Sequence, residues 1–191
     1  MILCQQIERL SPHLKSVSQL MEEYAAGNIA FPELALKWLD DAEKQLASLR
    51  VSGSSELATL KGRVLRAADG LHTGDEKPAR SKVRSARNVA AMDALQRGEE
   101  ILRGTVIDAE ERLQRFEDKL CEGMTALALQ VEIPSRSIPM TEWLGVVWML
   151  LLENAATRPL ATYLATSLSV VDRLFLLDTV LSRLQAPLPS E

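Results

Sequence analysis

The residue types that carry out most protein chemistry are scarce in this sequence and are not grouped at the spacings of known sites. The two histidines are far apart, and only Asp69-x-x-His72 places an acid near one of them. A zinc site needs three or four ligands, so this pair is interpreted as an exposed helix end, and His13 stands alone. We find no phosphate-binding glycine loop, no nucleophile elbow and no metalloprotease motif. The sequence therefore predicts no catalytic residue, cofactor or metal, and an enzyme with scattered site residues is the less favoured alternative.

Adjacent acidic residues do not supply an acid–base pair either. Neighbours on a helix point about 100° apart, so two adjacent carboxylates cannot share a proton. We interpret these pairs as solvated helix faces: Asp40-Asp41, Glu99-Glu100 and Glu110-Glu111.

A run of cations is the clearest candidate for binding chemistry. No acidic residue lies between Glu76 and Asp93, and five bases fall in this stretch: Lys77, Arg80, Lys82, Arg84 and Arg87. Such a run is usually a solvated face, but it could also contact the phosphates of a nucleic acid or an acidic protein surface. Because cations oppose the macrodipole at a helix N-terminus, an anionic partner would be favourable here. No aromatic residue lies between Trp38 and Phe116, so base stacking is not expected.

The elements that position these residues are predicted to be helices. Apolar residues recur at alternating steps of three and four along most of the chain, and no run of strict alternation indicates a strand. The chain is therefore predicted to be all-α. Residues 1–73 are expected to form an N-terminal three-helix region, with short loops that suit antiparallel neighbours in a bundle.

A heptad pattern dominates the next segment, residues 74–131, and predicts one helix from about residue 80 to Gln130. Glu99 and Gly123 interrupt the pattern. The first three helices are too short to cover so long a seam, which favours pairing with a second copy or with another protein over an internal bundle. The expected interface residues of the seam are Leu95, Leu102, Val106, Leu113, Phe116, Leu120 and Leu127.

Residues 132–139 are predicted to form a linker rich in proline and serine, and residues 140–185 are predicted to form an apolar C-terminal helical module. Residues 138–184 contain only seven charged side chains, and Trp143–Leu152 contains no polar one. A run of ten is too short to span a membrane, so no membrane contact is expected. The run is either the centre of a core or partly a docking surface, for which we name Trp143, Val147, Trp148 and Leu151. Ser169-x-x-Asp172 resembles a capping box that opens the last helix.

The composition agrees with one ordinary globular chain. Of 191 residues, 47% are hydrophobic and 25% charged, and the net charge of −4 excludes a strongly basic nucleic-acid binder. Only two cysteines, Cys4 and Cys121, are present and no leader is evident, so we expect reduced thiols and a cytoplasmic location.

These observations predict a non-enzymatic helical subunit or adaptor of a multiprotein assembly. Its partner would be another protein subunit or a second copy of the chain, bound through the coiled-coil seam and the C-terminal surface. The alternative hypothesis is a helical accessory factor that contacts nucleic acid non-specifically through Lys77 to Arg87, within an ATPase-containing complex.

Overall fold

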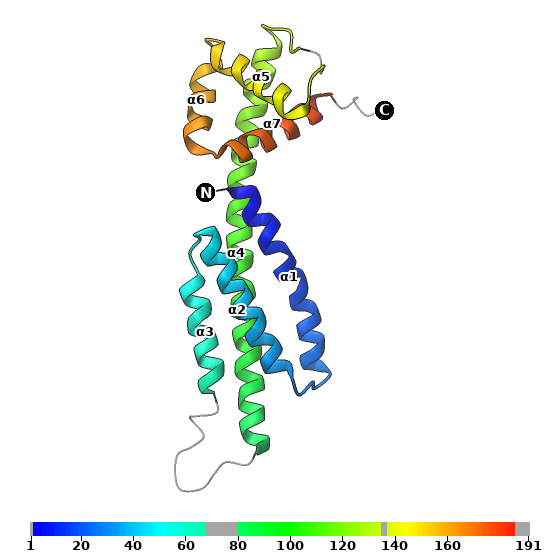
Figure 1. Ribbon diagram of the computed structural model, residues 1–191, viewed down its shortest axis with the longest axis vertical. Coiled ribbons are helices and arrows are strands. Elements are labelled where there is room, and N and C mark those ends of the chain that lie inside the picture. Colours follow the sequence, from blue (N-terminus) through cyan, green and yellow to red (C-terminus); the bar gives the residue numbers. More distant parts are fainter. Residues whose placement is uncertain (1, 68–79, 135–136, 186–191) are drawn as a thin grey trace. The chain divides into compact units, whose positions relative to one another are not determined.

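The fold is all-α, as the sequence predicts. The computed structural model describes residues 2–67, 80–134 and 137–185, and every regular element within these ranges is a helix (Figure 1). The helices are α1 (Leu3–Ala25), α2 (Phe31–Leu49), α3 (Ser54–Arg66), α4 (Arg80–Ala128), α5 (Met140–Glu153), α6 (Arg158–Ser167) and α7 (Val170–Gln185).

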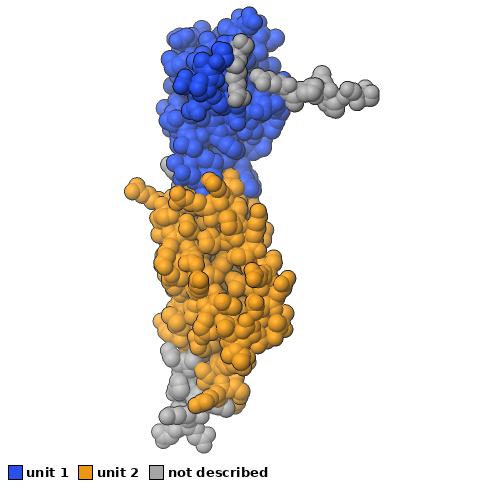
Figure 2. Space-filling view, turned by 45° about the vertical axis from the view of Figure 1, so that its right-hand side comes forward, with its two compact units in different colours: residues 1–5, 109–191 blue, residues 6–108 orange. Residues whose placement is uncertain are grey.

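The long helix expected from the heptad pattern is present as α4. The boundary between the two compact units of the chain lies within this helix and not at either of its ends. One compact unit contains Gln6–Asp108, and the other contains Met1–Gln5 and Ala109–Glu191 (Figure 2). We call them the bundle unit and the C-terminal unit. The structure therefore cuts across the expected segments, because each unit uses one part of α4 as a member of its core.

The bundle unit consists of α1 from Gln6 onward, α2, α3 and the first part of α4, and consecutive helices run antiparallel (Figure 1). Its core contains one buried face from each helix. Ion pairs join α2 to α3, because the ammonium of Lys61 lies 2.5 Å from a carboxylate oxygen of Asp40 and 2.8 Å from one of Glu43.

Two glycines let elements of the bundle unit approach closely. A Cβ atom added to Gly98 of α4 would lie 2.8 Å from the Trp38 ring and 3.0 Å from Leu39. Gly53 precedes α3 with a φ of 102°, a conformation that side chains rarely adopt, and faces Ile101. The packing of α4 on α2 therefore depends on a missing side chain at Gly98.

The C-terminal unit surrounds the end of α4 with α5, α6 and α7. Gly123, one of the two interruptions of the heptad pattern, is buried, and a Cβ atom there would lie 2.5 Å from Leu160 of α6. Glu117 of α4 pairs with Arg183 of α7. The interruption at Gly123 is thus a point of helix contact, since only glycine leaves room for Leu160.

Asp172 links the first residues of the chain to α7 inside the C-terminal unit. Its side chain is fully buried and accepts hydrogen bonds from the backbone N–H groups of Leu3 and Cys4, both at 3.0 Å. The hydroxyl of Ser169 donates to the same carboxylate at 2.8 Å, and the Asp172 N–H donates to that hydroxyl at 3.1 Å. The bond from the Asp172 N–H to the Ser169 hydroxyl is one half of the predicted capping box at the start of α7, whereas the Asp172 carboxylate accepts from the Ser169 hydroxyl and also caps α1.

Cys4 should react slowly with alkylating reagents. Burial, followed by the hydrogen bond to Asp172 and the charge of Asp172, raises the pKa of the Cys4 thiol to about 11. Because only the thiolate reacts, iodoacetamide at pH 8 should modify Cys4 on the order of 100-fold more slowly than an unperturbed thiol. The measurement is mass spectrometry on Cys121→Ser protein, and a rate equal to that of free cysteine would contradict the prediction.

Candidate functional site

Within the part of the chain that the structure describes, the residues with catalytic potential do not come together. The backbone carbonyl of His13 accepts a hydrogen bond from the Trp38 indole at 3.0 Å, and His72 lies outside the described residues. Hydrogen bonds from Lys44 and then Lys61 lower the pKa of Asp40 to about 2, so this carboxylate is ionised at neutral pH. Among the residues described, no three potential metal ligands are grouped, and no helix is long and apolar enough to cross a membrane.

The heptad seam is covered by the chain itself. Six of its seven expected interface residues are buried: Leu95, Leu102 and Val106 in the bundle unit, and Leu113, Leu120 and Leu127 in the C-terminal unit. Phe116 is half-buried, and its ring centre lies 6.1 Å from that of Tyr163 in α6. The seam side chains are therefore packed within the chain's own units, which is the alternative of an internal bundle. They do not present an open seam to a helix of another chain.

The four residues named for C-terminal docking also lie in the core. Trp143, Val147, Trp148 and Leu151 are buried on one face of α5, and the Trp143 indole donates to the Pro134 carbonyl at 2.9 Å. Successive residues of a helix point in different directions, and the opposite face of the same apolar run is exposed. The expected docking residues are corrected accordingly: Val146 is 42% exposed and Met149 is 51% exposed.

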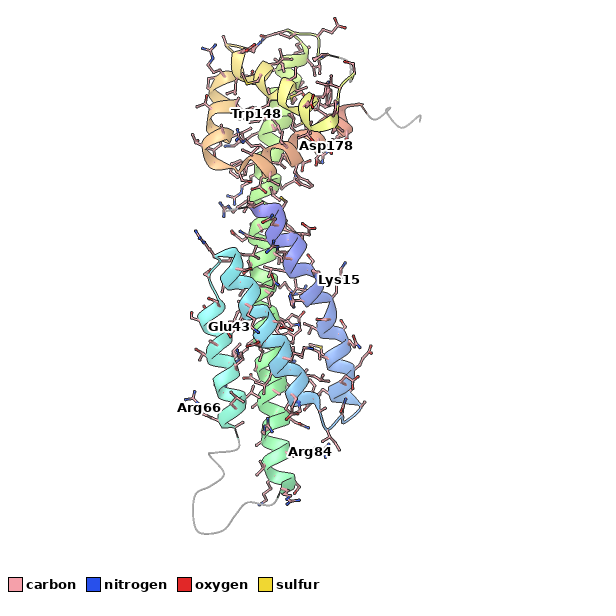
Figure 3. The ribbon with its side chains drawn as sticks, in the orientation of Figure 1. Lys15, Glu43, Arg66, Arg84, Trp148 and Asp178 are labelled. Carbon is pink, nitrogen blue, oxygen red and sulfur yellow. The ribbon has the colours of Figure 1, made fainter. Side chains whose placement is uncertain are left out.

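A groove lies between α5 and α7 in the C-terminal unit, and its lining is mainly apolar. We call it the α5–α7 groove, and its apolar lining includes Val146, Met149, Val170 and Leu174. Trp148 and Arg173 both line the groove, and the Arg173 guanidinium lies 5.1 Å from the centre of the Trp148 ring (Trp148 is labelled in Figure 3). This cation–π contact joins the two helices that line the groove.

Acidic residues mark both ends of α5 along this groove. Glu142 lies in its first turn and Glu153 is its last residue, and both line the groove with exposed side chains. Beside the groove, Val171 and Phe175 on α7 are also exposed. The surface of α5 and α7 therefore combines an apolar strip with anionic ends, which is suited to an amphipathic helix.

The basic segment is only partly assembled in the described residues. Lys77 lies outside them, whereas Arg80, Lys82 and Arg84 are exposed on the first turns of α4 (Figure 3 labels Arg84). Arg84 donates to the Gly27 carbonyl at 3.3 Å, and Arg87 forms an ion pair with Glu33 at 3.2 Å. Two of the cations thus connect α4 to its neighbours, Arg84 to the turn between α1 and α2 and Arg87 to the first turn of α2.

Sequence reasoning missed the exposed residues because it could not orient the helices. In the run Trp143–Leu152 every position is apolar, so the pattern contains no polar face that would identify the outside. The sequence does not distinguish Arg173, since a lone cation in a helix carries no signal until its aromatic partner is known.

The searches with this chain against family models, curated proteins and solved structures find no match.

Proposed function

We propose that this chain is a non-enzymatic helical subunit or adaptor of a multiprotein assembly, and that it binds an amphipathic helix of another subunit in the α5–α7 groove. The observation that carries the proposal is the apolar strip of Val146, Met149 and Val170, which is exposed although the core of the same unit is filled. Contiguous apolar surface on a globular protein usually marks an interaction site.

Burial of this strip would supply much of the binding free energy. Complete burial of one large aliphatic side chain contributes about 1.5–3 kcal/mol, and these three side chains are only partly exposed, so each contributes less. Trp148 and Arg173 are already fixed against each other, so the groove would lose little conformational entropy when a helix enters. These features support a preformed groove for a helix rather than a flat, weak contact.

The anionic ends of the groove define the partner more closely. Glu142 and Glu153 lie eleven positions apart on α5, which corresponds to about 16 Å along a helix axis. A helix that lies along α5 could pair with both carboxylates if basic residues flank its apolar face at a similar distance. We therefore expect an amphipathic partner helix with basic ends.

Site-specific photo-crosslinking tests this proposal in cells. A photoreactive amino acid at Met149 or Val170 should crosslink one defined protein, whereas the same amino acid at Leu129 should not. Leu129 is the control because it is 85% exposed and follows α4 outside the groove. Crosslinks that are equal at all three positions, or none at Met149 and Val170, would contradict the proposal.

Near-isosteric variants then test whether the captured protein binds in the groove. In the purified complex, Met149→Gln should weaken binding about tenfold, because a buried amide without a partner costs roughly 1–3 kcal/mol. Val146→Thr should act in the same direction, and Leu129→Gln should have no effect. Sedimentation of the chain alone is the second measurement: a dimer that Met149→Gln dissociates would assign the groove to self-association and overturn the adaptor role.

A further inference from the structure

The turn between α1 and α2 holds an exposed isoleucine in a fixed position. Ile29 is 69% exposed, yet the residues around it are held by hydrogen bonds. The Asn28 amide donates to Glu23 at 2.6 Å, and its oxygen accepts from the Ala30 N–H at 2.9 Å. A large apolar side chain on such a rigid turn loses little entropy on binding, so its exposure favours a role in recognition.

Arginines from α4 line a groove next to this isoleucine. The lining of the groove includes the apolar residues Ile29, Pro32 and Val83 and the cations Arg80, Arg84 and Arg87. The first two arginines have no acidic partner within the described residues, and Glu33 is the one acid in the lining. We call this the Ile29 groove, and its lining combines apolar side chains with arginines.

We propose that the Ile29 groove binds an acidic peptide segment of a partner protein, with one apolar side chain inserted between Ile29 and Val83 and carboxylates on Arg80 and Arg84. Charge complementarity supports this occupant, because three arginines line the groove and its one glutamate, Glu33, forms its ion pair with Arg87, so Arg80 and Arg84 remain for an anionic ligand. The site lies entirely within the bundle unit and does not depend on the α5–α7 groove. An adaptor with both sites would join two different partners.

The position of Lys82 separates a peptide site from a general phosphate surface. On a helix, residues 80, 83, 84 and 87 lie on one face, while residue 82 points to the opposite side. Lys82 does not line the groove although it is exposed and belongs to the same basic run. A nucleic-acid backbone would use Lys82 as readily as the arginines and would gain nothing from Ile29.

A selection from a random peptide display library tests the proposal without assuming a sequence. The full chain should enrich peptides that combine aspartate or glutamate with one large apolar residue. Their affinity should fall about tenfold with Arg84→Glu, which removes a charge contact to the peptide, and about tenfold with Ile29→Ser, which removes an apolar contact. The matched control Lys82→Glu should change the affinity less than about twofold.

Other outcomes of this experiment would overturn the proposal. These are the absence of enrichment, enrichment of peptides without acidic residues, and equal losses with Lys82→Glu and Arg84→Glu. A short DNA duplex is the second probe. If it binds at low salt, loses affinity equally in both charge variants and is insensitive to Ile29→Ser, the segment is a phosphate surface and not a peptide site. Circular dichroism of each variant confirms that the helices are intact.

Discussion

Replacement of Gly98 by valine is expected to destabilise the bundle unit by about 3 kcal/mol or more, a large part of the stability of a typical domain. A Cβ atom at this position would lie 2.8 Å from Cζ3 of Trp38 and 3.0 Å from Leu39. The Trp38 ring has little freedom to move, because its indole N–H donates to the His13 carbonyl at 3.0 Å and to the Ser16 hydroxyl at 3.1 Å. Helix α4 must therefore shift outward or α2 must repack.

A second glycine of the same helix provides the control. Gly104 is exposed, and a Cβ atom there would meet nothing within 4 Å. Gly104→Ala should therefore stabilise the protein by about 0.5–1 kcal/mol through helix propensity alone. Urea unfolding measures both changes, and amide exchange in Phe31–Leu49 locates the effect of Gly98→Val. Equal stability of Gly98→Val and the unmodified protein would show that α4 does not pack closely on Trp38.

Asp172→Asn is expected to destabilise the C-terminal unit by about 3 kcal/mol, since hydrogen bonds to a charged group contribute roughly 1.5–3 kcal/mol each. The carboxylate accepts from two backbone N–H groups and one hydroxyl, whereas an amide would turn its NH₂ group toward at least one of these donors. Amide exchange at Leu3 and Cys4 should accelerate in the variant. Ser169→Ala, which removes only the hydroxyl, should have a smaller effect.

The contribution of Asp172 should also depend on pH. Burial by itself raises the pKa of this carboxyl, but hydrogen bonds from Cys4, Leu3 and Ser169 outweigh burial and hold the pKa below its ordinary value. A lowered pKa in the folded state means that the stabilisation is complete above about pH 4 and is lost as the pH falls through the folded-state pKa. The stability difference between the unmodified protein and Asp172→Asn should therefore shrink on acidification. A difference that is constant between about pH 6 and pH 3 would contradict this assignment.

The local elements of the fold could be predicted from particular residues. Proline is favoured in the first turn of a helix, and Pro32 and Pro159 are the second residues of α2 and α6, which begin at Phe31 and Arg158. The heptad pattern predicted a helix from about residue 80 to Gln130, and α4 runs from Arg80 to Ala128. These features depend on backbone geometry and on the spacing of apolar residues over a few turns, so they can be read without a tertiary structure.

The candidate site was less predictable, because the identity of a residue does not determine what covers it. The sequence named Trp148 as a docking residue, but the structure buries most of it and exposes Met149 instead. It identified the cations of the basic run, but it did not show that Ile29, more than fifty positions away from Arg84, lines the same groove. Both outcomes depend on contacts between residues that are distant in the chain.

By itself, the sequence determined that this protein is all-α, that one helix is much longer than the others, and that the C-terminal part is poor in charge. Tertiary structure alone decided that the seam of α4 is filled by the chain's own helices, and that Gly98 and Gly123 are points of close packing. The physical reason is that an apolar stripe only requires burial, and burial by another chain or by the same chain satisfies it equally. Only the placement of the other helices shows which of the two occurs.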